Sequence, residues 1–253
     1  MLQEETDMID LHSHILPELD DGSDSLAESL AMARMAVDSG VTAMVATPHC
    51  AFDRRDEVLE SWKLLSQALK ETHIPLKLYP GMEIFGTDET VRLLREGKLL
   101  TLNGSRYPLV EFDFQGSGET QTLLLRELCD AGYRPLVAHP ERYAYVQRDP
   151  RLINGWFKMG CLMQVNRGSL LGRFGRNVQA MAVELVERGF ATVVASDAHG
   201  YRSRTPWMGD VRRMLTGEIT ALCAQVLLHD NPEKILKNEP LEQIDPEWFY
   251  ATN

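Results

Sequence analysis

Short apolar runs that end in a histidine or a carboxylate recur along this chain and constrain its fold more than any other feature. One run ends in Asp-Leu-His-Ser-His, and later runs end in Ala-Thr-Pro-His, Ala-His-Pro-Glu-Arg and Ser-Asp-Ala-His. Two more end in Gly-Met-Glu and Leu-Val-Glu. The residues at these ends that can bind metal are His12, His14, His49, Glu83, Glu111, His139, Asp197 and His199. Such side chains at the ends of successive strands predict one polynuclear metal site.

The apolar runs alternate with stretches whose apolar residues recur at helical spacing. Strands are predicted over 8–14, 41–48, 76–84, 107–112, 134–139, 160–166 and 191–197. Helices are predicted over 24–39, 55–72, 87–96, 119–131, 149–159 and 177–189, with a helical tail over about 207–229. In the first helix, Leu26, Leu30, Ala33 and Val37 recur at steps of three and four, and Gly40 follows where a helix commonly ends. This alternation is typical of a parallel sheet covered by helices.

The placement of the candidate ligands favours a closed sheet over an open one. The alternation fits a distorted (β/α)7 TIM-like barrel with parallel strands and an outer ring of helices, in which functional side chains lie at the carboxyl ends of the strands. A doubly wound open sheet is the alternative, but it would gather ligands from two or three strands at one switch point. Here six of the seven predicted strands contribute. Because no linker or low-complexity segment interrupts the chain, residues 1–253 are predicted to form a single domain.

Composition limits the classes of function. The formal net charge of −11 argues against a nucleic-acid binder, which would carry a basic face. It does not exclude a phosphorylated substrate, because bound cations can reverse the field inside one pocket. We expect neither a signal peptide nor a membrane-spanning helix. Cys50, Cys129, Cys161 and Cys223 form no Cys-x-x-Cys pair, which predicts a cytoplasmic protein without a disulfide framework.

The candidate ligands favour two or three divalent ions. His12 and His14 are two apart on a strand, so their side chains point to one side and can bind the same ion. Imidazole and carboxylate ligands without thiolates suit Mn, Fe, Zn or Mg, and the sequence does not choose among these metals. Eight candidates are too many for one ion, and Glu111, from the middle strand, is the best candidate for a bridge. Two neighbouring ions would activate a bridging water for an in-line phosphoryl displacement.

Two arginines follow strands that carry candidate ligands. Arg142 lies three residues after His139, and Arg204 lies seven residues after Asp197. A planar guanidinium offers paired donors that match phosphate oxygens. We therefore expect both arginines to hold phosphoryl oxygens and to stabilise charge in the transition state.

One further pattern matches a phosphatase motif in its spacing alone. Cys161 and Arg167 match the Cys-x5-Arg spacing of cysteine-dependent tyrosine phosphatases. That chemistry needs a loop of small residues that wraps backbone N–H groups around phosphate. Leu162, Met163 and Val165 instead predict a buried strand, so we reject a cysteine mechanism.

In their order, these motifs resemble the polymerase and histidinol phosphatase (PHP) superfamily, and within it the bacterial manganese-dependent protein-tyrosine phosphatases of capsule and exopolysaccharide systems. The opening His-Ser-His-Ile-Leu-Pro-Glu-Leu-Asp-Asp-Gly is particularly similar to that branch, and the resemblance runs from about residue 8 to 206. It implies a trinuclear site, with manganese as the expected metal, held by the eight histidines and carboxylates named above. Arg142 and Arg204 match the family's phosphate-handling arginines, and Asp21 matches a family acid. The loop Gly-Tyr-Arg-Ser at 200–203 differs from the Asn-containing version of the branch.

The resemblance implies a phosphatase that hydrolyses phosphotyrosine on a protein by attack of a metal-bridging hydroxide. The implied partner is a bacterial tyrosine autokinase that regulates capsule or exopolysaccharide synthesis. Histidinol-phosphate phosphatase, or another small-molecule phosphoesterase of the superfamily, is the alternative. Amidohydrolase barrels also open with His-x-His but usually carry a modified lysine on the fourth strand, where this chain has Glu111. A metal-stabilised regulatory barrel without turnover would not need both arginines.

Overall fold

Two parallel sheets form the centre of the molecule. The computed structural model describes residues 7–49 and 54–241, and Cys50 lies outside the described residues. The first sheet has the order β1 (Met8–Ser13), β2 (Val41–Ala46) and β3 (Lys77–Pro80). The second sheet has the order β4 (Glu83–Phe85), β5 (Leu109–Glu111), β6 (Leu136–Ala138), β7 (Leu162–Asn166) and β8 (Ala191–Ala195). All neighbouring strands in both sheets are parallel, which confirms the predicted α/β class with parallel strands.

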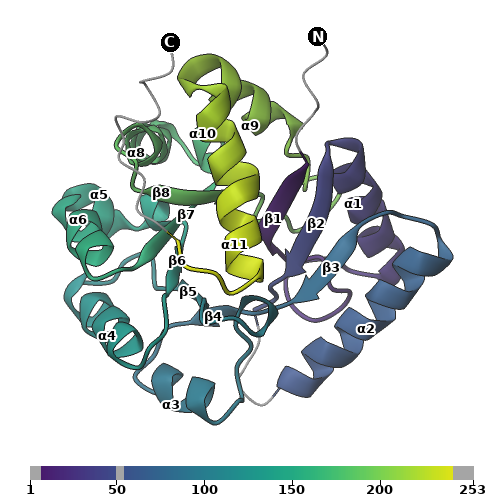
Figure 1. The fold of residues 1–253 in the computed structure, drawn as a ribbon, viewed down its shortest axis with the longest axis horizontal. Coiled ribbons are helices and arrows are strands. Elements are labelled where there is room, and N and C mark those ends of the chain that lie inside the picture. The colour runs from purple at the N-terminus through teal and green to yellow at the C-terminus, as the bar shows by residue number, and fades with distance from the viewer. Residues whose placement is uncertain (1–6, 50–53, 242–253) are drawn as a thin grey trace.

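Helices surround the strands (Figure 1). They are α1 (Leu26–Asp38), α2 (Arg55–Glu71), α3 (Thr90–Arg95), α4 (Glu119–Asp130), α5 (Ala144–Arg148), α6 (Arg151–Lys158), α7 (Arg167–Leu170), α8 (Arg176–Glu187), α9 (Gly209–Met214), α10 (Ala221–Gln225) and α11 (Asn231–Leu236). Short 3-10 helices η1 (Leu102–Gly104) and η2 (Pro140–Arg142) and π-helical segments η3 (Leu215–Ile219) and η4 (Val226–Asp230) complete the set. Within the described part of the chain, no helix combines the length and the apolar character needed to cross a membrane.

Local chemistry explains the helix that follows β1. The hydroxyl of Ser25 accepts a hydrogen bond from the backbone N–H of Glu28 and so caps the start of α1. Gly40 follows the helix with a φ of 96°, a left-handed conformation that glycine adopts without strain. The chain therefore turns sharply into β2, which pairs with β1.

The prediction of a single strand over 76–84 is wrong. The structure divides this segment into β3 and β4, which belong to different sheets, so the molecule has eight strands in the described residues where seven were predicted. The chain crosses between the sheets at Gly81, where a Cβ would lie only 2.9 Å from Cγ1 of Val45. A glycine allows this close approach of the backbone.

The second half of the chain holds more helix than the sequence predicted. The predicted tail over 207–229 is a succession of α9, η3, α10 and η4, and the predicted helix over 149–159 is α6 with a separate α5 before it. Neither α7 nor α11 was predicted. Pro232 is the second residue of α11, and a proline is tolerated in the first turn of a helix, so it does not prevent this helix.

Apolar side chains from both sheets are buried together. Leu11, Leu109, Leu136 and Val193 are buried in one cluster, together with Ile235 from α11. Helix α11 packs against β1 and β8 and closes this cluster (Figure 1). Polar side chains such as His14, His139 and Asp197 follow β1, β6 and β8 directly or within two residues.

Candidate metal centre

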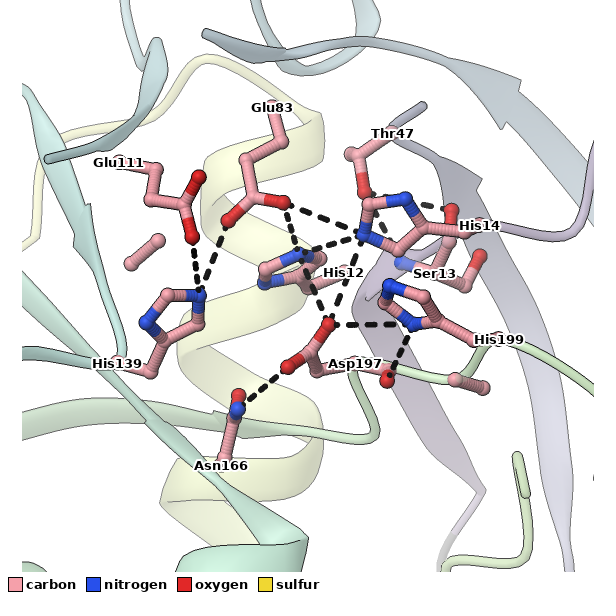
Figure 2. Close-up of polar contacts among 12 residues, drawn as sticks. His12, Ser13, His14, Thr47, Glu83, Glu111, His139, Asn166, Asp197 and His199 are labelled. Atoms are coloured by element: carbon pink, nitrogen blue, oxygen red, sulfur yellow. Dashed lines mark hydrogen bonds and ion pairs between the residues drawn. The ribbon is translucent and has the colours of Figure 1, made fainter. Parts of the chain in front are cut away.

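The eight candidate ligands lie at or just after the carboxyl ends of β1, β2, β5, β6 and β8 and at the start of β4. Figure 2 labels seven of them, all except His49. His12 lies in β1 and His14 directly after it, while His49 follows β2. Glu83 begins β4, and Glu111 ends β5. The remaining candidates follow β6 and β8, and they are His139, Asp197 and His199.

The most buried group joins the two sheets. Ligand atoms of His12, His14, Glu83 and Asp197 all lie within 4.8 Å of one another, and all four residues are buried. Glu83 Oε2 lies 3.0 Å from His12 Nε2 and 3.2 Å from His14 Nε2. Asp197 Oδ1 lies 3.5 Å from His12 Nε2 (Figure 2). These nitrogen and oxygen atoms converge on one small space.

Two further groups share members with the first. One contains His14, Asp21, His49 and His199, and the other contains His49, Glu83 and Glu111. Glu83 therefore belongs to two groups, whereas Glu111, the bridge expected from the sequence, belongs to one. His139 adds its Nε2 at 3.1 Å from Glu83 Oε1.

The donor atoms fit divalent cations. Asp197 Oδ1 and His139 Nδ1 are buried and have no hydrogen-bond partner among the described residues. Burying an unpaired carboxylate oxygen is unfavourable unless a cation or a donor compensates it. Imidazole nitrogens and carboxylate oxygens without thiolates suit first-row divalent metals. The residues present therefore fit a metal cluster.

Burial and mutual charge perturb the candidate ligands. Burial would raise the pKa of Glu83, but His12 and hydrogen bonds from the surrounding histidines hold this pKa well below its usual range. Burial and the charge of Glu83 raise the pKa of Glu111 to about 7. Burial and His14 lower the pKa of His199 to about 4. Perturbed groups that cluster in this way are typical of functional sites.

The carboxylate that orients His14 was missed by the sequence reasoning. Asp20 Oδ2 accepts hydrogen bonds from His14 Nδ1, at 2.6 Å, and from the backbone N–H of His49, at 2.8 Å. A protonated Nδ1 leaves His14 Nε2 free to face the site, as is usual for metal-binding histidines. Asp21, the acid named from the sequence, is largely exposed and lies 3.4 Å from His199 Nε2. Both acids belong to the Asp-Asp-Gly turn, which was the available sequence signal.

Both predicted arginines reach the site through Asp197. Arg204 Nη2 donates to Asp197 Oδ2 at 2.6 Å, and Arg142 Nη1 donates to the same oxygen at 3.3 Å. The backbone is left-handed at Asp197, at Arg204 and at His139, with φ between 33° and 51°. Such conformations cost a non-glycine residue about 1–3 kcal/mol and concentrate at functional sites.

Arg142 contacts two aromatic rings that the sequence did not reveal. Its guanidinium carbon is 4.7 Å from the ring centroid of Phe114 and 4.4 Å from that of Phe174. Gly168 makes room for the second ring, because a Cβ there would lie 2.8 Å from Cε2 of Phe174. Both contacts are short enough for favourable cation–π interactions.

Cys161 and Arg167 do not form a phosphate-binding loop. Cys161 is buried beside β7, and its hydrogen bond with Cys129, together with burial, raises the pKa of its thiol. Arg167 is buried and donates from Nε to Asp210 Oδ1 at 2.7 Å. The thiol is therefore a poor nucleophile, and the arginine is engaged elsewhere.

The chain is similar to proteins of known activity along nearly its whole length. It is 34% identical to the tyrosine-protein phosphatase YwqE of Bacillus subtilis, over 95% of this chain and 96% of YwqE. It is 31% identical to the tyrosine-protein phosphatase CpsB of Streptococcus pneumoniae, over 92% of this chain and 99% of CpsB.

Solved structures agree. A structure from work on YwqE and CpsB, described there as unique metal-dependent tyrosine phosphatases, superposes with a TM-score of 0.89 at 34% identity and covers 94% of this chain and 97% of that one. The phosphotriesterase homology protein of Escherichia coli superposes with a TM-score of 0.61 at 14% identity, over 92% of this chain and all of the other, which shows a shared fold alone. The family model for capsular polysaccharide synthesis proteins CpsB/CapC matches residues 8–237. This chain therefore belongs to the CpsB/CapC family.

Proposed function

We propose that this protein is a metal-dependent phosphatase that hydrolyses phosphotyrosine on a protein substrate. The observation that carries the proposal is the convergence of eight candidate ligands beside two arginines that both contact Asp197. The names of YwqE and CpsB support it, because both are tyrosine-protein phosphatases that align with almost the whole chain. The substrate that we propose is a bacterial tyrosine autokinase of a capsule or exopolysaccharide system, since the family model is one of capsular polysaccharide synthesis.

The architecture that we propose is one distorted barrel, formed as a single domain by residues 1–253. Support comes from two isolated parallel bridges between the sheets, Ser13 with Ala198 and His49 with Glu83. We also propose a cytoplasmic location, because Cys129, Cys161 and Cys223 are free thiols, as is usual in a reducing compartment.

Two or three divalent ions, with manganese expected, complete the proposed site. The residues proposed to hold them are His12, His14, His49, Glu83, Glu111, His139, Asp197 and His199, with Asp21 at the exposed edge beside His199. When bound, such ions supply a water of lowered pKa and positive charge for phosphoryl oxygens.

The protein's own groups bind and orient the phosphoryl group. Arg142, in contact with the rings of Phe114 and Phe174, and Arg204 present N–H donors beside Asp197 and would bind the non-bridging oxygens. Their positive charge offsets the charge that develops on these oxygens in the transition state. A tyrosine phenolate leaves with a pKa near 10, so it needs little help from a general acid.

One set of assays tests this proposal. Chelator-treated protein should lack turnover of p-nitrophenyl phosphate, and added Mn²⁺ should restore it. A phosphotyrosine peptide should then be hydrolysed with a higher kcat/KM than histidinol phosphate. Full activity in metal-free protein would refute the metal site, and a preference for histidinol phosphate would favour the small-molecule alternative.

A further inference from the structure

Strand β7 carries none of the eight candidate ligands, yet two of its side chains connect a pair of them. Gln164 and Asn166 are two apart on the strand and are completely buried. Gln164 Oε1 lies 2.9 Å from His12 Nδ1, and Gln164 Nε2 donates to Asn166 Oδ1 at 2.7 Å. Asn166 Nδ2 donates to Asp197 Oδ2 at 2.6 Å (Figure 2). We call these two side chains the amide pair.

The donor and the acceptor of each hydrogen bond from His12 through the amide pair to Asp197 can be assigned. The backbone N–H of His139 lies 3.3 Å from the Gln164 atom that faces His12, and a backbone N–H can only donate. That atom must therefore be the carbonyl oxygen, so Gln164 presents its NH₂ group to Asn166. Asn166 must then accept with its oxygen and donate with its own NH₂ group, which matches the carboxylate of Asp197.

These assignments determine which atom of His12 and which atom of Asp197 faces the site. Because Gln164 Oε1 only accepts, His12 Nδ1 must carry a proton and donate it to this oxygen, which turns Nε2 toward Glu83 Oε2, 3.0 Å away. At the other end, Asn166 and Arg204 occupy Asp197 Oδ2, so that Oδ1 faces the histidines without a hydrogen bond from the described residues.

A further contact holds the amide pair in place from outside the site. The backbone N–H of Asn166 donates to Glu141 Oε1 at 3.0 Å, which ties the end of β7 to η2. Buried polar chains in which every donor finds an acceptor are rigid, and partly satisfied ones are costly. The amide pair is therefore built to hold one arrangement.

We propose that Gln164 and Asn166 are positioning residues that act as one unit, presenting His12 Nε2 and Asp197 Oδ1 together to a divalent cation. The inference rests on the proposed function in one respect, namely that these two atoms bind metal. It goes beyond that function because it assigns a role to the strand that supplies no ligand. Residues that orient metal ligands typically change metal affinity by about 10–100-fold when they are replaced.

The test is a double-mutant cycle in Mn²⁺ affinity, measured by calorimetry on chelator-treated full-length protein. Gln164→Met and Asn166→Leu keep the side-chain volume close to that of the amides and remove the hydrogen bonds. Each should weaken Mn²⁺ binding by about 10–100-fold, and the double variant should be no more than about threefold weaker than the worse single variant. Losses that multiply in the double variant would show that the two residues act separately and would overturn the proposal, as would unchanged affinity in folded single variants.

A matched control separates positioning from general stability. Asn231 is also buried and donates from Nδ2 to the backbone oxygen of Thr192, at 2.8 Å, away from the site. Asn231→Leu should lower the unfolding temperature and leave Mn²⁺ affinity unchanged. If Gln164→Met does not fold, Gln164→Glu keeps the shape and the oxygen that faces His12 but loses the donor to Asn166. The Mn²⁺ affinity of Gln164→Glu should fall even though the substitution adds negative charge. A gain in Mn²⁺ affinity would contradict the proposal.

The same experiment distinguishes this inference from the proposed function. If the unaltered protein binds Mn²⁺ but does not hydrolyse phosphotyrosine, the function fails while the amide pair is still tested by affinity. If the unaltered protein turns over with Mn²⁺ and the folded variants bind the metal equally well, the function stands and the positioning role is wrong. If the unaltered protein binds no Mn²⁺, both fail.

Discussion

Arg142 shows how a single side chain depends on neighbours that are remote in sequence. A cation over an aromatic face gains about 0.5–2 kcal/mol, and Arg142 contacts the rings of Phe114 and Phe174. We expect Phe174→Leu to lower kcat/KM for a phosphotyrosine peptide by about 3–30-fold, which is the kinetic equivalent of losing one such contact. The bound metal content, measured by elemental analysis, should not change, because Phe174 contacts the arginine rather than a candidate ligand.

The control for this variant is Phe190→Leu. Phe190 packs edge-on against Phe157, away from the site. The substitution Phe190→Leu removes a comparable ring and should lower stability without changing kcat/KM. Equal kinetic losses in the two variants would count against a role for the aromatic pair.

Glu141 should make stability depend on pH. Burial raises its pKa to about 7 from an ordinary value of 4.5, so the folded protein holds this proton more tightly than the unfolded chain. Unfolding then releases a proton between about pH 4.5 and 7, and the free energy of unfolding falls as pH rises through this window. Each unit of pKa shift corresponds to about 1.4 kcal/mol.

The variant Glu141→Gln isolates this effect, because a glutamine can still accept the N–H of Asn166 but does not titrate. Its stability relative to the unaltered protein should increase from pH 5 to pH 8, measured by urea unfolding of both proteins without metal. If the difference in unfolding free energy between the two proteins were the same at pH 5 and pH 8, Glu141 would not be the group that carries the proton.

The sequence was sufficient to identify functional residues that stand in short, recognisable motifs. The eight candidate ligands and both arginines stand in motifs at strand ends, and the structure brings them together. Asp20, Gln164 and Phe174 were missed because their roles depend on which partner the fold places opposite them. A buried glutamine on an apolar strand looks like any other strand residue until His12 is found beside it.

At the scale of elements, the loop between β1 and α1 is constrained by one glycine. A Cβ on Gly22 would lie 2.5 Å from His14 Cβ and closer still to the backbone oxygen of His14. The N–H of Gly22 also donates to Asp20 Oδ1, the carboxylate that orients His14. Gly22→Ala should therefore displace this loop, destabilise the protein by about 1–3 kcal/mol and weaken Mn²⁺ binding by at least about tenfold.

Gly155 provides the matched control within α6. A Cβ there would meet no heavy atom within 4 Å in the described part of the chain, apart from the helix's own backbone. Alanine is favoured over glycine inside a helix by up to about 1 kcal/mol, so Gly155→Ala should stabilise the protein slightly. Thermal unfolding and Mn²⁺ titration of both variants measure the contrast. Normal Mn²⁺ affinity in Gly22→Ala would show that the loop does not position the site.

Most elements followed from periodicity, and the exceptions have physical causes. The strand and helix alternation was visible because buried strands read as apolar runs and α1 has a regular apolar stripe. The division of residues 76–84 was not visible, because it depends on the approach of Gly81 to Val45 across the sheet. Helix α11 was missed because the sequence does not distinguish a proline in the first turn of a helix from one that ends a helix.

At the scale of the whole molecule, the candidate ligands lie where the two sheets meet. We call these two places, between β1 and β8 and between β2 and β4, the joints. Full strand pairing gives way there to single bridges, Ser13 with Ala198 and His49 with Glu83. Each of the three groups of ligands takes members from both sheets or from the segments that follow them. Metal bound in these groups would therefore link the sheets at both joints.

Removal of metal should consequently weaken the whole molecule and not only its activity. A ligand that binds only the folded state adds about 4 kcal/mol at a thousandfold excess over its Kd, so chelation should lower the unfolding temperature markedly. Hydrogen exchange should rise most at the joints, at residues 12–14, 46–49 and 196–199, because these segments lose their cross-links. The pairing of β6 with β7 lies inside one sheet and serves as the internal control. Exchange that rises equally in β6 and at the joints, or an unfolding temperature that chelation leaves unchanged, would mean that the two sheets hold together without the metal.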